Sequence, residues 1–240
     1  MKHPVRFRTD KYLAGWQMSL LNPMGHLVLI NSVLDSHLNY VMGAMKMPKG
    51  TICGIDQRRR SFLWAGQKTT TGAHCLVAWD SVTKGRADGG LGVKDLETCN
   101  TCLHLRLLHR LHNSTCSSWG AWERQHICLA TLTGNLPGAH WHALRSGLPI
   151  YRAITTCEVR NGHGTAFWHD AWCSDNDLAS TFPALLSHVK NPELGIHDVL
   201  TQGLQSTLVT RLSEQARQEL AALNEKLNLV TLTAAPDVRH

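Results

Sequence analysis

Three consecutive arginines, Arg58, Arg59 and Arg60, form a cluster whose side chains could hold phosphate groups, and Lys46 and Lys49 lie shortly before them. A guanidinium group presents a planar fork of donors that matches phosphate oxygens, and neighbouring cations neutralise the backbone of a nucleic acid. We therefore predict that these five residues form a nucleic-acid-binding site. The alternative interpretation is a helix face that only water covers, because runs of charge are commonly solvated surface.

A Cys-x-x-Cys pair, Cys99 and Cys102, is followed by three histidines and has the residue types of a zinc site. On a helix, however, His109 lies roughly 10 Å beyond Cys102, whereas zinc bonds are about 2.0–2.3 Å long. The sequence contains no second Cys-x-x-Cys pair. We therefore predict no metal site and no cofactor, and expect a helix with small apolar thiols and with His104, His109 and His112 facing solvent.

Two histidines, His163 and His169, and three aspartates, Asp170, Asp175 and Asp177, are crowded into one stretch and could imitate a hydrolytic metal site. No nucleophile can be paired with a general base from the sequence, so we predict no catalytic residue here. Instead, we expect the neighbouring indoles to be packed, and Asp170 to cap a turn or to accept a hydrogen bond from an indole N–H group.

The composition is that of a globular protein: 43% of the 240 residues are hydrophobic and 18% are charged, which argues against general disorder. The aliphatic run from Leu27 to Ile30 is far shorter than the roughly 20 residues of a membrane span. The basic start of the chain has no apolar stretch behind it, unlike a secretory signal. We expect an intracellular protein, nuclear or cytoplasmic, that is not secreted, makes no membrane contact and keeps its cysteines as free thiols.

The net charge of +6 is distributed unevenly along the chain. Residues 1–110 hold 15 lysines and arginines against 7 acidic residues, a balance of +8, whereas residues 111–240 hold 9 against 11, a balance of −2. This asymmetry indicates that the N-terminal half faces a polyanion, most simply RNA or DNA.

The elements that must position these residues are predicted to be mainly helices, and residues 1–66 form the first group. Apolar spacing indicates a helix around residues 13–20, and a second helix begins where Asn22 precedes Pro23. The third helix opens at Pro48 and ends at Gly66, with its arginines spread over the surface. The apolar stripes of these helices consist of Leu13, Trp16, Leu20, Leu27, Ile30, Leu34, Leu38, Ile52, Ile55 and Phe62.

Residues 67–94 are rich in glycine and are predicted to connect two parts of the protein. Within this connector, residues 76–79 are apolar and are expected to form one buried strand. We therefore place a subdomain boundary in this segment.

Residues 95–240 are predicted to be α-rich with a small β-hairpin. The hairpin is expected over residues 157–169, where the sequence alternates around a glycine-rich tip. Asp95 is expected to cap the first helix of this region. The helices are predicted, in order, over residues 95–112, around 119–127, around 141–148 and over 212–227.

Several blocks of sequence occur in the order found in one family of proteins. Together they resemble the region that follows the polymerase palm in plant non-LTR (LINE-type) retrotransposon reverse transcriptases. The stretch RRRSFLWAG over residues 58–66, for example, is similar to the family pattern RRxFLWxG. The blocks are residues 12–16, 20–34, 42–48, 58–66, 75–80, 89–96 and 161–172.

The resemblance implies that residues 1–66 are a helical, thumb-like segment of an RNA-directed DNA polymerase, and that residue 240 lies just before the family's zinc-binding segment. This chain has no Tyr-x-Asp-Asp motif and no two adjacent aspartates, although a polymerase needs such carboxylates to hold two metal ions. We therefore expect no enzymatic activity. His26 stands where the family usually has arginine, and Thr83 where it often has cysteine, and both changes suit a drifting copy.

Three hypotheses about function follow from these observations. The first is a non-catalytic fragment derived from a retrotransposon reverse transcriptase, which retains at most an affinity for a primer–template of RNA or DNA. The second is a protein-interaction module, in which exposed helices dock on a partner such as another retroelement polypeptide. The third is a gene remnant without a selected function.

Overall fold

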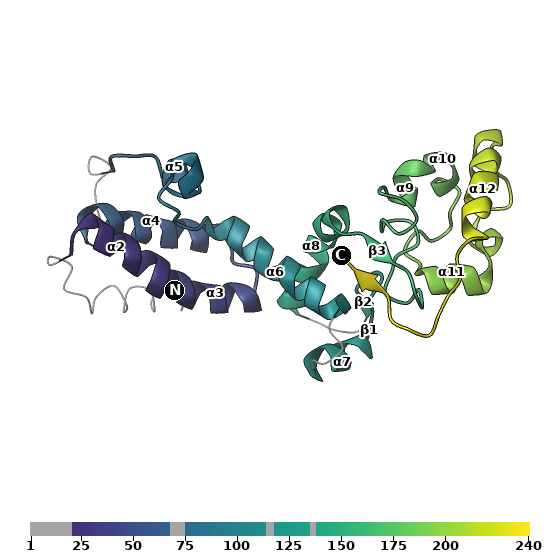
Figure 1. The fold of residues 1–240 in the computed structure, drawn as a ribbon, viewed down its shortest axis with the longest axis horizontal. Coiled ribbons are helices and arrows are strands. Elements are labelled where there is room, and N and C mark those ends of the chain that lie inside the picture. The colour runs from purple at the N-terminus through teal and green to yellow at the C-terminus, as the bar shows by residue number, and fades with distance from the viewer. Residues whose placement is uncertain (1–20, 68–74, 114–117, 135–137) are drawn as a thin grey trace. The chain divides into compact units, whose positions relative to one another are not determined.

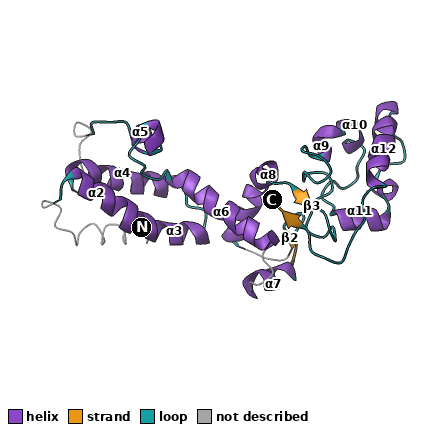
Figure 2. Ribbon diagram, in the orientation of Figure 1, coloured by secondary structure: helices purple, strands orange, loops and turns teal. Residues whose placement is uncertain are grey.

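The computed structural model describes residues 21–67, 75–113, 118–134 and 138–240. The helix predicted around residues 13–20 and the sequence block at 12–16 lie outside the described residues. The described chain is mainly helical and contains two small antiparallel sheets, as the sequence predicted (Figure 1, Figure 2). The described residues form two compact units, one within residues 1–104 and the other within residues 105–240. No helix in the described ranges is long and apolar enough to cross a bilayer.

The first described helix of unit 1 begins where the sequence predicted. Asn22 caps α2 (Pro23–Leu29) by accepting a hydrogen bond from the backbone N–H of Gly25 at 2.8 Å, and Pro23 occupies the first helical position. A π-helical turn (Ile30–Leu34) and α3 (Asp35–Ala44) follow without interruption. The predicted apolar stripe is buried and consists of Leu27, Ile30, Leu34 and Leu38.

Helix α4 (Lys49–Ala65) also has the predicted bounds. Pro48 precedes it, and Gly66 ends it in the left-handed conformation, with φ of 60°, while donating its N–H to the carbonyl of Phe62 at 3.0 Å. Glycine suits this position because it adopts positive φ without steric cost. The side chains predicted to face inward, Ile52, Ile55 and Phe62, are buried.

The strand predicted at residues 76–79 is wrong. Trp79–Val82 form the short helix α5, and Leu76 is 81% exposed. A run of four apolar residues does not distinguish a strand from a helix, and Asp80 in the first turn favours the helix through its interaction with the helix dipole.

The described part of the glycine-rich segment, residues 75–94, belongs to unit 1 instead of connecting two domains. Val82 and Val93 are buried in one cluster with Phe62 and Leu63. A single-turn 3-10 helix (Arg86–Asp88) lies between these two valines in the sequence. The two compact units divide within helix α6 (Leu96–Asn113), between residues 104 and 105, and not at residue 66.

Asn100 joins the first half of α6 to the turn between α3 and α4. Its side-chain amide donates to the carbonyls of Met42 at 2.7 Å and Met45 at 3.1 Å, and its oxygen accepts from the N–H of Met47 at 2.9 Å. Asn100 itself is buried. It therefore satisfies three backbone groups that water cannot reach.

Unit 2 begins with the second half of α6, which packs against α8 (Ala139–Ile154). In the sequence, α6 and α8 are separated by α7 (Ser118–Arg124) and by a hairpin of β1 (Ile127–Cys128) and β2 (Thr133–Gly134). The buried side chains of this cluster are Leu108, Leu111, Ile127, Leu132, Trp141, Leu144, Leu148 and Tyr151. The helix predicted around residues 141–148 is therefore confirmed, whereas Ile127 lies in a strand and not in a helix.

The hairpin predicted over residues 157–169 does not form. β3 (Cys157–Glu158) pairs antiparallel with β4 (Val238–Arg239), about eighty residues further along the chain. The alternating pattern was present, but residues 159–169 make turns held by side-chain hydrogen bonds instead of a returning strand.

The remaining helices of unit 2 enclose a second core. They are α9 (Leu178–Thr181), α10 (Pro183–Leu186), α11 (Ile196–Gln202), a 3-10 helix (Leu204–Thr207) and α12 (Glu214–Leu227). The predicted tail helix is confirmed as α12, whose N-cap Ser213 accepts from the N–H of Ala216. Its buried Ala216 and Leu223 pack into the cluster that contains Phe167 and Trp168.

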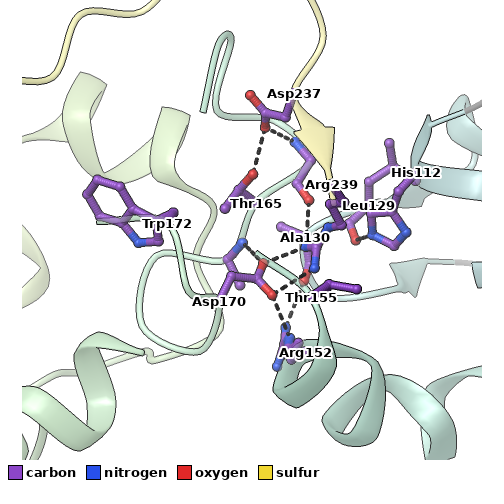
Figure 3. Close-up of polar contacts among 12 residues, drawn as sticks. His112, Leu129, Ala130, Arg152, Thr155, Thr165, Asp170, Trp172, Asp237 and Arg239 are labelled. Carbon is purple, nitrogen blue, oxygen red and sulfur yellow. Dashed lines mark hydrogen bonds and ion pairs between the residues drawn. The ribbon is translucent and has the colours of Figure 1, made fainter. Parts of the chain in front are cut away.

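His112 lies between two backbone carbonyls at the end of α6 (Figure 3). Its ring nitrogens are 2.9 Å from the oxygen of Leu108 and 3.2 Å from that of Leu129. Protonation would let the ring donate to both oxygens, but burial and the nearby Arg239 guanidinium oppose a second positive charge and lower the pKa of His112 to about 4. The imidazole is therefore neutral at pH 7 and donates through one nitrogen.

Replacing Asn100 by alanine is expected to lower the free energy of unfolding by about 1–3 kcal/mol, because buried backbone groups lose their partners. Thr101→Ala is the matched control, since Thr101 bonds only within its own helix. Urea denaturation of both variants measures the difference. Equal stabilities of the two variants would contradict the role given to Asn100.

Lowering the pH from 6.5 to about 4 is expected to lower the free energy of unfolding of unit 2 by up to about 3 kcal/mol, because of His112. In this window the unfolded chain takes up a proton at His112 and the folded chain does not, so the free energy of unfolding falls as the pH falls. Urea denaturation at pH 7, 6 and 5 should show a shallower decline for His112→Gln than for the natural chain. Parallel declines would contradict the prediction.

Candidate nucleic-acid interface

Helix α4 carries four of the five predicted phosphate-binding residues, and Lys46 lies just before it. At roughly 100° per residue, Lys49 and Arg60 are about 20° apart around the helix axis, whereas Arg58 is about 180° from Lys49. Exposed Gln57 lies between these two edges. The exposed arc of the helix therefore carries Lys49 and Arg60 along one side, whereas Arg58 lies beyond its other side, next to the buried Gly54 and Ser61.

Arg59 is not part of this arc, so the prediction that all three arginines lie on the surface is wrong. Its side chain is fully buried. The guanidinium forms ion pairs with Asp56 at 2.8 Å and with Asp35 of α3 at 3.2 Å, and donates to the carbonyl of Lys94 at 2.9 Å. It also lies over the ring of Trp79, 5.6 Å from its centroid.

The position of Arg59 on the helix explains its burial. It comes four residues after Ile55 and three before Phe62, and therefore lies on the stripe that faces the core. Burial raises the pKa of Asp35 and of Asp56, and the guanidinium beside them opposes that rise. Because arginine keeps its proton in proteins, these two carboxylates compensate the buried charge at close range.

Arg60 and Arg58 are half-buried and use their guanidinium groups differently. Arg60 lies over the ring of Trp79 at 5.5 Å from the centroid, so this indole contacts two neighbouring arginines. Arg58 donates to the carbonyl of Gly54 in its own helix at 2.9 Å. Sequence reasoning missed Trp79, although a tryptophan in a polar, glycine-rich segment was a signal that it contacts another part of the chain.

The two lysines are the most accessible members of the predicted site. Lys46 is exposed, and 88% of the Lys49 side chain is exposed, with its ammonium 3.5 Å from a carboxylate oxygen of Glu97. An ion pair between two exposed side chains contributes little to stability. A phosphate could therefore replace Glu97 as the partner of Lys49 at little cost.

The only acidic residue in α4, Asp56, is bound to Arg59. The Asp56 side chain is 16% exposed and its carboxylate is paired with Arg59, so α4 has no unpaired carboxylate of its own next to Lys49, Arg58 and Arg60. A surface of this kind attracts a polyanion without selecting a base sequence.

The residues considered for a zinc site are not brought together. Cys99 is half-buried and donates to a side-chain oxygen of α3, while Cys102 is exposed. Of the three histidines predicted to face solvent, only His109 does so, since His104 is buried and His112 contacts two carbonyls. Among the described residues, no group of three or more His, Cys, Asp or Glu side chains could hold a metal ion.

Asp170 contacts a backbone N–H group and two arginines, and none of the described indoles donates to it (Figure 3). Its carboxylate accepts from the N–H of Ala166 at 2.6 Å, which caps a turn as predicted. It also forms ion pairs with Arg239 at 2.6 Å and with Arg152 at 3.4 Å. The indole N–H of Trp172 donates to a backbone carbonyl and not to Asp170.

Comparison with known proteins gives one distant relative. Over 179 residues, 71% of this chain, the sequence is 26% identical to the Arabidopsis thaliana protein named "Putative ribonuclease H protein At1g65750". The match covers 29% of that protein, so this chain spans less than a third of the relative's length. No protein-family model matches the chain, and no solved structure matches it.

Replacing Arg59 by alanine is expected to lower the free energy of unfolding of unit 1 by about 3–5 kcal/mol, because two buried carboxylates lose their counter-charge. Arg58→Ala, on the same helix, is the matched control and should cost less than about 1 kcal/mol. Denaturation followed by tryptophan fluorescence measures both variants. A small and equal effect of the two substitutions would contradict the structural role of Arg59.

Proposed function

We propose that this chain is a non-catalytic part of a plant retroelement polypeptide, derived from a LINE-type reverse transcriptase, that binds nucleic acid through the exposed arc of α4. The observation that carries the proposal is the inward position of Asp35 and Asp56. Both carboxylates pair with Arg59, so α4 presents cations without an acidic residue of its own beside them.

Three further observations support the proposal. The balance of +8 over residues 1–110 favours a polyanionic partner. The blocks of sequence resemble the segment after the palm of plant LINE-type reverse transcriptases. The Arabidopsis relative is named "Putative ribonuclease H protein At1g65750", a name that refers to RNA.

The expected binding mode is electrostatic. Lysine and arginine side chains on one helix contact backbone phosphates and release counterions, so affinity falls steeply as salt increases. No base-reading element is required, and a primer–template of RNA and DNA is the natural test ligand. Arg59 positions this surface from below and does not contact the ligand.

The test compares two triple variants of the full chain with equal loss of charge. Lys46→Gln, Lys49→Gln and Arg58→Gln remove cations from the α4 region, while Lys190→Gln, Arg211→Gln and Arg217→Gln remove three exposed cations from unit 2. Binding to a labelled RNA–DNA primer–template is titrated from low to physiological salt. We expect the slope of log affinity against log salt to decrease by roughly three in the α4 variant and to stay unchanged in the unit 2 variant.

Circular dichroism melts establish that both variants are folded before binding is compared. A folded natural chain that does not bind at low salt would contradict the proposal. So would equal salt slopes in the two triple variants, because the charge of α4 would then have no special part in binding.

A further inference from the structure

Residues 237–240 lie in unit 2 like a docked peptide, and Asp237 makes the first set of contacts. One of its carboxylate oxygens accepts from the backbone N–H groups of Arg160 at 2.7 Å and Gly162 at 2.9 Å. The other accepts from the N–H of Gly164 and the hydroxyl of Thr165, both at 2.9 Å. Four donors that converge on one carboxylate form an anion-binding concavity built largely from backbone groups.

Arg239 makes the second set of contacts (Figure 3). Its two terminal nitrogens donate to the two oxygens of Asp170 at 3.0 and 2.6 Å, and one also donates to the carbonyl of Gly164 at 3.1 Å. The guanidinium lies 5.4 Å from the centroid of Tyr151. A paired, two-point contact of this kind selects arginine over lysine.

The backbone of the same segment is held on both of its edges. Asn113 donates to the carbonyl of Arg239 at 2.7 Å and accepts from its N–H at 2.9 Å. On the opposite edge, His240 and Thr156 exchange two hydrogen bonds, and β4 pairs with β3. Backbone pairing supplies affinity for any strand, and the pockets for Asp237 and Arg239 supply selectivity.

The spacing of the recognised side chains matches an extended strand. Residues two apart point to the same side of a strand, and here Asp237 and Arg239 are buried while His240 is exposed. The recognised unit is therefore Asp-x-Arg. A cavity of about 430 Å³, lined partly by Asn161 and His163, adjoins the segment and leaves one side of it open.

The connection to α12 is loose in comparison. Residues 228–236 contain no helix or strand, and all except Val230 are exposed. Outside its first turn, the segment makes one backbone hydrogen bond to the rest of unit 2, from the N–H of Thr233 to the carbonyl of Arg160. The segment 237–240 therefore depends on its own contacts to stay in place.

We propose that this cradle is a strand-recognition site for extended Asp-x-Arg segments, and that it accepts residues 237–240 of a second copy of this chain as well as its own. The cradle consists of the donors around Asp237, the Asp170 carboxylate, Asn113 and the edge of β3. Binding in trans requires the resident segment to leave, so the resident segment competes with the incoming one.

The test uses the full chain and a labelled peptide of residues 230–240, which stands for the segment of a second copy. In the chain, Asp237→Asn and Arg239→Gln weaken the binding of the resident segment to the cradle. The amide N–H₂ of asparagine opposes the donors around residue 237, and glutamine cannot donate to both oxygens of Asp170. Fluorescence anisotropy should show at least tenfold tighter binding of the peptide to this double variant than to the natural chain. The control peptide carries the same two substitutions and should not bind either chain.

Two further measurements test the proposal if the double variant does not fold alone, and test the part that Asp170 plays in peptide binding. If the double variant is unfolded alone, the natural peptide should restore its thermal transition at a one-to-one ratio and the control peptide should not. Adding Asp170→Asn to the double variant should remove peptide binding. Equal binding of the two peptides, or a folded double variant that binds neither, would overturn the proposal. None of these measurements involves nucleic acid, so they stand apart from the test of α4.

Discussion

The burial of one permanent charge, that of Arg59, constrains the whole of unit 1. An arginine inside a core requires carboxylates beside it, and these come from α3 and from α4 itself, as Asp35 and Asp56. The Arg59 guanidinium also donates to the carbonyl of Lys94 and lies over the ring of Trp79, so two residues of the glycine-rich segment contact the same buried charge. The interaction therefore fixes the packing of two helices and removes acidic groups from the exposed side of α4.

Unit 2 contains a second buried arginine that is compensated in another way. Arg239 meets Asp170 from a segment 69 residues away in sequence, and the contact is paired and hydrogen-bonded on both oxygens. Burial disfavours the charged guanidinium, but the opposing interactions, of which the ion pair with Asp170 is the largest, together raise the pKa of Arg239. In unit 1 the buried pair organises a helical core, whereas in unit 2 it anchors an extended segment.

Local signals predicted most helices correctly, because capping and apolar spacing are read within one turn. Asn22, Pro23 and Gly66 mark helix ends in the structure as in the sequence. The burial of Arg59 could not be predicted from the run of arginines, since its partner Asp35 lies 24 residues earlier and only the fold brings them together. The pairing of residues 157–158 with 238–239 was missed for the same reason: alternation indicates a strand but not its partner.

The two small sheets of unit 2 also differ in how quickly they can form. β1 and β2 are joined by a short turn, so their pairing needs little loop closure, whereas β3 and β4 are separated by about eighty residues. Pairing over such a separation carries a larger entropic cost before any contact is gained. During folding of unit 2, α6, α8 and the first sheet should therefore become ordered first. At that stage, the ion pair between Asp170 and Arg239 has not yet formed. During that stage the edge of β3 is an open template for another strand.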